Sequence, residues 1–238
     1  MKLLNVVKNF INKIFNKKNL YDYNLAYVKE LYDFIIDTYE IMECNVISAK
    51  IIYSQLRLLK PKLLENIKSI KDYEEFWDYL KKNYHNKLFF SKPFVAIKPF
   101  NNIYEVTLEY LRTLNGFDNQ TIIKFENKIG YESTKGSNIY IDALYNEFIQ
   151  VDETMMIKKD IFNLDEIVLK RIKNNLELYF KTNEVLETKT FKAFFTFPTL
   201  PGYSWNKYLL VGIVRTYLNA DYKIEKIAYE TDYIIRRK

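Results

Sequence analysis

Phe-Ile-Gln-Val-Asp-Glu-Thr-Met-Met-Ile-Lys occupies residues 148–158, with two apolar runs on either side of a short polar turn. The same arrangement closes the chain, where residues 222–227 and 233–237 flank another polar turn. Short runs of β-forming residues joined by turn residues predict a β-hairpin. Helical segments precede both hairpins, so the second half of the chain contains one pattern twice.

Start and stop residues mark the helices of the first copy. Gly116 lies where the first helix should end, and Asp118 or Asn119 can cap the second, which Gly130 ends. A turn at residues 135–138 precedes the third helix. The predicted helices span residues 101–114, 120–129 and 137–147.

The second copy begins with a long helix over residues 166–180, capped at residues 163–165, and continues through an ambiguous segment at residues 183–196. Ser204 is predicted to cap a helix over residues 205–218. That helix is apolar on nearly every face, which predicts a buried position. The aromatic residues of the preceding segment are also expected in the core: Phe191, Phe194, Phe195 and Phe197.

Three helices followed by a hairpin is the order of a winged helix-turn-helix. Residues 1–84 are predicted to be helical, with a helix over residues 46–59, and residues 87–100 to be a strand or extended connector at the domain boundary. The predicted fold class is mostly α with small β-hairpins (α+β). The expected domains are an N-terminal helical region at 1–98 and winged-helix-like modules at 99–160 and 161–238.

The composition favours an anionic partner. The chain has 238 residues, a formal net charge of +6 and 48% hydrophobic residues, enough for a sizeable core. A basic balance favours nucleic acid or an acidic membrane surface, although abundant Lys, Asn and Ile also reflect an AT-rich coding bias. Cys44 is the single cysteine. It cannot form an internal disulfide, so a reducing, cytoplasmic location is expected, and no signal peptide or membrane span is predicted.

Residues 1–18 combine helical apolar spacing with five lysines and no acid. This pattern is typical of a helix on an anionic membrane, of a basic arm on nucleic acid, or of a terminal helix packed on the protein. The sequence leaves these three interpretations open.

Few residues suit catalysis. His85 lies among lysines and Cys44 in an apolar stretch, so a surface position and a core position are the simpler interpretations. No metal or cofactor motif is present, and a non-enzymatic protein is expected. One weak alternative is a Mg²⁺-dependent nuclease that uses acids and lysines. Its residues would be Glu126, Lys128, Glu187 and Lys189, with Asp118 and Asp165 as further acids.

Basic and polar residues form the predicted DNA-binding surface, because lysines neutralise phosphates and the first turn of a recognition helix contacts bases. In the first copy the candidates are Lys124, Lys128, Lys135, Ser137, Asn138 and Tyr140. In the second copy they are Lys207, Lys223, Lys226, Arg236 and Arg237. Asp142 and Glu147 oppose this interpretation, because they would repel phosphate if they faced it.

The stretch from Ile139 to Ile157 resembles the third helix and wing of bacterial winged-helix proteins. Residues 197–210 resemble C-terminal segments of regulator-like bacterial proteins, and the likeness covers residues 101–238 at most. The resemblance implies a regulator or replication-associated factor that binds double-stranded DNA. Winged helices also bind proteins, so an adaptor with a protein partner or a second copy of the chain is the alternative.

Overall fold

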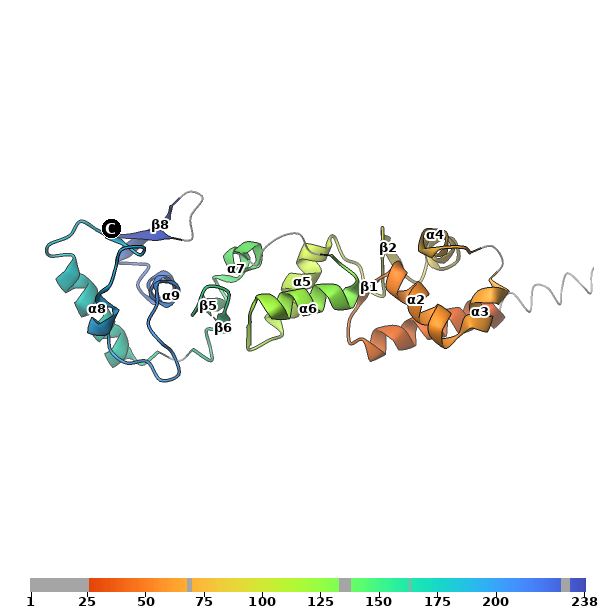
Figure 1. Cartoon of the computed structure of the whole chain (residues 1–238), viewed down its shortest axis with the longest axis horizontal. Coiled ribbons are helices and arrows are strands. Elements are labelled where there is room, and N and C mark those ends of the chain that lie inside the picture. The colour runs from red at the N-terminus through yellow and green to blue at the C-terminus, as the bar shows by residue number, and fades with distance from the viewer. Residues whose placement is uncertain (1–25, 68–69, 133–137, 163, 228–231) are drawn as a thin grey trace, which may run out of the picture. The chain divides into compact units, whose positions relative to one another are not determined.

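The computed structural model describes residues 26–67, 70–132, 138–162, 164–227 and 232–238 (Figure 1). The predicted α+β class is confirmed: helices dominate, and the strands form small antiparallel sheets. The described part of the chain repeats one arrangement three times, rather than twice. Each copy runs helix, strand, helices and hairpin, and its sheet has the strand order first–third–second.

The N-terminal module, residues 26–96, is the copy that the sequence did not reveal. It begins with a helix over residues 26–41 and ends in a hairpin whose second strand pairs with the first strand of the module. Its further elements are β1 (Val46–Ser48), α2 (Ala49–Leu59), α3 (Pro61–Asn66), α4 (Tyr73–Tyr84), β2 (Phe89–Ser91) and β3 (Phe94–Ala96).

One expectation for this module was wrong. Residues 46–48 form a strand instead of the start of a helix, because Ser48 caps α2 by accepting a hydrogen bond from the N–H of Lys50. Of the two interpretations of residues 87–100, the strand is confirmed: the segment contains a hairpin that pairs with β1. A three-residue buried strand has too few positions to show periodicity.

The middle module, residues 103–158, follows the predicted order except at Gly116, which was expected to end the first helix but lies in strand β4, paired with Ile157. Asp118 precedes α6 and accepts hydrogen bonds from the N–H and Oγ1 of Thr121, and Gly130 follows the helix with φ +80°. The elements are α5 (Ile103–Arg112), β4 (Gly116–Phe117), α6 (Asn119–Ile129), α7 (Asn138–Leu144), β5 (Phe148–Gln150) and β6 (Met156–Lys158).

The C-terminal module, residues 166–237, starts at the predicted cap, where Asp165 accepts from the N–H of Ile167. The cap of its last helix is Asn206 instead of Ser204. The ambiguous segment holds both a strand and a 3₁₀ turn. The elements are α8 (Glu166–Tyr179), β7 (Val185–Glu187), η1 (Ala193–Thr196), α9 (Lys207–Tyr217), β8 (Tyr222–Lys226) and β9 (Tyr233–Arg237).

The chain divides into two compact units. The first contains the chain up to Val106 together with Glu126–Glu132, and the second contains Thr107–Phe125 and Ser133–Lys238. The core of the first unit joins the helix of residues 26–41 to α2, α4 and the sheet. The core of the second unit includes Ile149 and Val151 of the middle module together with α8, α9 and the C-terminal sheet.

Helix α9 lies against β5, so the middle and C-terminal modules share this core (Figure 1). The approach is close: a Cβ on Gly212 would lie 2.4 Å from the carbonyl oxygen of Gln150. Asn206 adds a hydrogen bond of 2.9 Å from Nδ2 to the carbonyl oxygen of Val151. The β5–β6 hairpin of the middle module therefore packs with the C-terminal module in one core.

Candidate nucleic-acid interface

Helix α9, the last helix before the C-terminal hairpin, is not open to a ligand. Every residue from Tyr208 to Val214 is buried. The apolar sequence of this helix predicted that result. The side chains that would enter a DNA groove pack instead within the second unit.

The cations of the C-terminal hairpin are close to carboxylates. Lys223 Nζ lies 2.9 Å from Glu225, and Arg236 Nε lies 3.4 Å from the same carboxylate. Their hydrogen bonds and charges lower the pKa of Glu225, with Lys223 the larger influence. Arg237 pairs with Glu177. Exposed ion pairs of this kind are weak because water and salt screen them, so these cations can exchange a carboxylate for a phosphate.

Lys207 is more tightly held than the hairpin cations. Its Nζ lies 2.8 Å from Asp232, and both side chains are largely covered. Burial alone would lower the pKa of Lys207, but hydrogen bonds and charge attraction from Asp232 and Tyr208 outweigh it, and the pKa is raised. Lys207 therefore contributes mainly to the internal structure of the module.

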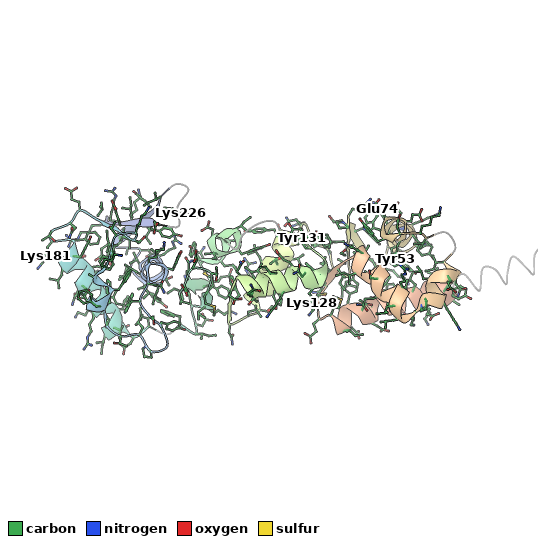
Figure 2. The ribbon with its side chains drawn as sticks, in the orientation of Figure 1. Tyr53, Glu74, Lys128, Tyr131, Lys181 and Lys226 are labelled. Atoms are coloured by element: carbon green, nitrogen blue, oxygen red, sulfur yellow. The ribbon has the colours of Figure 1, made fainter. Side chains whose placement is uncertain are left out.

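Both acids that argued against a DNA-facing α7 have cationic neighbours. Lys226 Nζ lies 4.0 Å from Asp142, and Arg112 Nε lies 2.8 Å from Glu147. Figure 2 labels Lys226 on the C-terminal hairpin. The local charge around α7 is thus nearer neutral than its sequence indicates.

Lys124 and Lys128 are exposed on α6. Neither enters an ion pair within the described ranges, and Figure 2 labels Lys128 among the side chains of the first unit. Lys128 also opposes the effect of burial on Cys44: burial raises the pKa of the thiol, and the lysine charge lowers it in part. Among the predicted phosphate contacts in the described part of the chain, these two lysines are exposed and enter no ion pair.

The predicted base-reading residues fare differently. Tyr140 is only 3% exposed, so its ring belongs to the core and cannot reach a base edge. Asn138 begins α7, but its side chain is outside the described part. Lys135 and Ser137 lie outside the described residues.

Arg215, a residue that the sequence did not single out for function, joins the two modules of the second unit. Its guanidinium carbon lies 3.7 Å from the ring centre of Tyr145 and 5.6 Å from that of Tyr233. Tyr145 donates a hydrogen bond of 3.1 Å to Gln150 Oε1, and burial raises its pKa although Arg215 opposes the shift. The sequence carried no signal for this contact, because Arg215, Tyr145 and Tyr233 are separated in the chain and meet only in the folded structure.

The exposed face of α4 carries charges of both signs. Asp72 caps the helix, and Glu74 and Glu75 follow in its first turn, whereas Lys81 and Lys82 occupy its last turn. Acids at a helix N-terminus stabilise the helix but disfavour a phosphate there. The N-terminal module is therefore a poor match for DNA at the start of α4.

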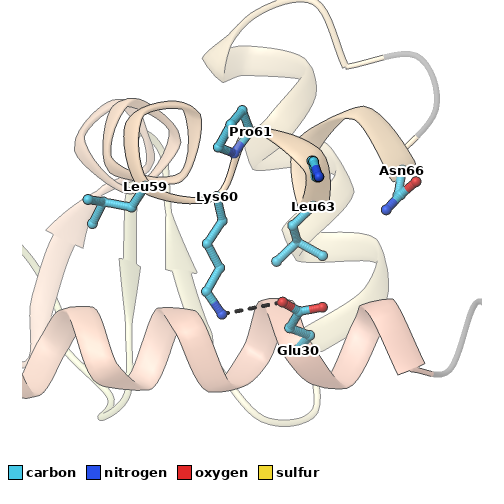
Figure 3. A pocket seen from close by; sticks show the side chains of 7 residues that line it. Glu30, Leu59, Lys60, Pro61, Leu63 and Asn66 are labelled. Atoms are coloured by element: carbon cyan, nitrogen blue, oxygen red, sulfur yellow. Dashed lines mark hydrogen bonds and ion pairs between the residues drawn. The ribbon is translucent and has the colours of Figure 1, made fainter.

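The first unit also contains a pocket of about 390 Å³ beside the helix of residues 26–41 (Figure 3). An ion pair between Lys60 Nζ and Glu30, 3.3 Å apart, crosses it. Pro61 starts α3 at this point. The lining residues are Glu30, Leu59, Lys60, Pro61, Lys62, Leu63 and Asn66.

One prediction about the aromatic segment was wrong. Phe191 and Phe197 are buried and Phe194 packs against them, as expected, but Phe195 is 87% exposed. All four residues are phenylalanines in one short segment. The sequence alone therefore could not show that η1 directs the ring of Phe195 outward.

The three acids Asp118, Asp165 and Glu126 of the nuclease alternative have structural positions. Asp118 and Asp165 cap helices, and Glu126 is buried in α6. The hydrogen bonds from Thr121 lower the pKa of Asp118. His85 is exposed after α4. Within the described ranges, no group of three or more His, Cys, Asp or Glu residues could hold a metal ion.

Comparison with models of known families, with curated proteins and with solved structures finds no match for this chain. In the described part of the chain, no helix combines the length and apolar character needed to cross a bilayer. The basic N-terminal segment, residues 1–18, lies outside the described residues.

Proposed function

We propose that the protein is a non-enzymatic DNA-binding protein built from three winged-helix modules, acting as a regulator or replication-associated factor. The observation that carries the proposal is the threefold recurrence of one topology, helix–strand–helices–hairpin with strand order first–third–second, in a chain of net charge +6. Basic proteins that repeat a small module along the chain suit an extended polyanion. A reducing compartment such as the cytoplasm fits the single, unpaired Cys44.

The middle module is the favoured DNA-contacting part. Its helix α6 presents Lys124 and Lys128, and the acids of α7 have cationic neighbours. By contrast, α9 is buried and the start of α4 is acidic. The C-terminal hairpin adds basic side chains that can exchange a carboxylate partner for a phosphate.

A duplex-binding titration tests the proposal. Fluorescence anisotropy at about 50 and 200 mM salt should show affinity that falls steeply with salt, because bound phosphates release counterions. A Lys124→Ala/Lys128→Ala variant should reduce the slope of log K against log salt by roughly 2 if both lysines contact phosphate. No binding by the unmodified protein at low salt would refute the proposal.

The matched control removes the same charge elsewhere. Lys98 and Lys181 are exposed and enter no ion pair within the described ranges. The Lys98→Ala/Lys181→Ala variant should leave the slope nearly unchanged. An equal loss in both double variants would show that only net charge matters, and would remove the assignment to α6.

A protein-binding adaptor is the second candidate, and the burial of α9 favours it. In this chain the third helix of a module already serves as a docking element, packed against β5 of the neighbouring module. The acidic start of α4 also suits a basic protein partner better than DNA. Light scattering after size exclusion, with binding to DNA no tighter than that of an unrelated basic protein, would support this candidate.

A further inference from the structure

The 3₁₀ turn η1 holds one aromatic ring outside the core of the C-terminal module. The rings of Phe191 and Phe194 are 5.0 Å apart, and those of Phe191 and Phe197 are 5.9 Å apart. Phe195 lies between these packed residues in the sequence, yet it is the most exposed large apolar side chain in the described part of the chain. Leaving a Phe side chain in water forgoes the free energy of its burial, which makes its position informative.

The backbone that carries Phe195 is firmly held. Asn175 of α8 donates a hydrogen bond of 2.5 Å from Nδ2 to the carbonyl oxygen of Thr196. Thr196 donates from Oγ1 to the carbonyl oxygen of Ala193, and the ring of Phe197 stacks on Trp205 with centres 4.7 Å apart. The turn that carries the exposed ring is therefore held in place by contacts on both of its sides.

Cations accompany this ring. Lys192 immediately precedes η1, and Arg171 lies one helical turn before Asn175 on α8. Both are exposed, and neither enters an ion pair within the described ranges. The acid on this part of α8, Glu177, is already engaged by Arg237 and Tyr222. The two elements that hold the ring, η1 and α8, thus each carry or adjoin an exposed cation.

We propose that Phe195 is a wedge that inserts between stacked base pairs of duplex DNA, while Arg171 and Lys192 contact the flanking phosphates. Architectural DNA-binding proteins use Phe in this way, unstacking a base step and kinking the duplex. A projecting ring on elements that also carry exposed cations suits a stacked polyanion. This inference rests on the proposed DNA binding.

Duplexes that contain 2-aminopurine report unstacking, and end-labelled duplexes report bending by energy transfer. With the full-length protein at saturating concentration, 2-aminopurine emission should rise and the duplex ends should approach each other. Phe195→Ala should abolish both signals and weaken binding by about tenfold, the loss expected for one base–aromatic contact. Phe195→Trp should retain the bend and show tryptophan quenching by DNA.

The control is Ile167→Ala, which removes another exposed apolar side chain, at the start of α8. It should leave emission, bend and affinity unchanged. Arg171→Ala should reduce the salt slope by about 1 without abolishing the 2-aminopurine signal.

The outcomes separate the two proposals. Failure of the unmodified protein to bind duplex DNA at low salt would overturn both. Salt-sensitive binding with the same emission and bend in the unmodified protein and Phe195→Ala would leave DNA binding standing and overturn the wedge. Unchanged DNA signals combined with loss of self-association in Phe195→Ala would assign the ring to a protein contact and likewise overturn the wedge.

Discussion

Gly212 shows how a single missing carbon lets two modules share a core. Alanine normally stabilises a helix relative to glycine by about 0.5–1 kcal/mol. Here a Cβ would lie 2.4 Å from the carbonyl oxygen of Gln150 and 3.0 Å from the side chain of Ile149. The neighbour at the closest point is backbone, which cannot rotate away.

Gly212→Ala should therefore lower the free energy of unfolding by about 1–3 kcal/mol, the usual range for overpacking a core. Urea denaturation followed by circular dichroism measures the change. Thr216→Ala, one turn further along α9, is the control and should have a much smaller effect. A raised midpoint for Gly212→Ala would mean that β5 and α9 are not packed as closely as described.

Asp118 connects a helix cap to the pH dependence of stability. Its hydrogen bonds from Thr121 lower its pKa in the folded protein, so the ionised form is favoured by folding. This stabilisation is present above the pKa of the unfolded chain, about 3.9, and is lost as the pH falls through the folded value.

Asp118→Ala should consequently cost about 1 kcal/mol near pH 7, the usual value of an N-cap, and less near pH 3. Urea titrations at both pH values test the sign. Asp160→Ala removes an exposed carboxylate in a loop and provides the comparison. A cost that is independent of pH would show that the carboxylate charge contributes nothing to the cap.

At the scale of elements, the sequence predicts some features well and others not at all. Caps and turn residues placed α6 and α8, and the two hairpins of the second half were found where runs of β-forming residues and turn residues predicted them. Such signals are local, because a cap or a turn depends on a few neighbouring residues.

The missed elements depend on distant contacts. Strand β1 has three residues and is recognisable only because β3 pairs with it. The carboxylates beside Arg236 and Arg237 come from Glu225 and Glu177, and only the folded chain brings them together. The outward ring of Phe195 depends on how η1 docks onto α8. A single sequence contains these contacts only implicitly.

The stacking of Arg215 on Tyr145 couples α9 to the segment after α7. The Nη1 atom of Arg215 is buried without a hydrogen-bond partner in the described part of the chain, so ring contact is a main attraction for this group. Cation–π contacts contribute about 0.5–2 kcal/mol, with larger values when water is excluded.

A double-mutant cycle with Arg215→Met and Tyr145→Leu should give a coupling energy of about 1 kcal/mol in denaturant unfolding. Arg215→Lys should recover only part of the coupling, because an ammonium group lacks the planar face that stacks on the ring. Additive single effects would show that the two side chains are near each other without interacting.

For the whole molecule, the two cores predict two cooperative regions. Ile213 lies in the core that the middle and C-terminal modules share, whereas Leu80 lies in the core of the first unit. Residues of one packed unit tend to open together and so share one local stability. Amide hydrogen exchange measures that stability.

Ile213→Ala should accelerate exchange in β5 and in the C-terminal sheet together, because a buried Ile→Ala change costs about 2–5 kcal/mol to the common core. Leu80→Ala should act on the strands β1, β2 and β3. Faster exchange confined to residues 166–237 in Ile213→Ala would contradict a core that includes the middle module.

Because α9 packs closely against β5, these two elements should stay together when the chain is divided into fragments for expression. A fragment that begins after residue 158 would retain α9 but lose the strand that covers Gly212. It would present apolar helix surface to water, and such surface promotes aggregation. Domain-mapping work on this protein should therefore keep β5 and α9 in one fragment, because insolubility of a piece without β5 would reflect exposed apolar helix surface and not a missing activity.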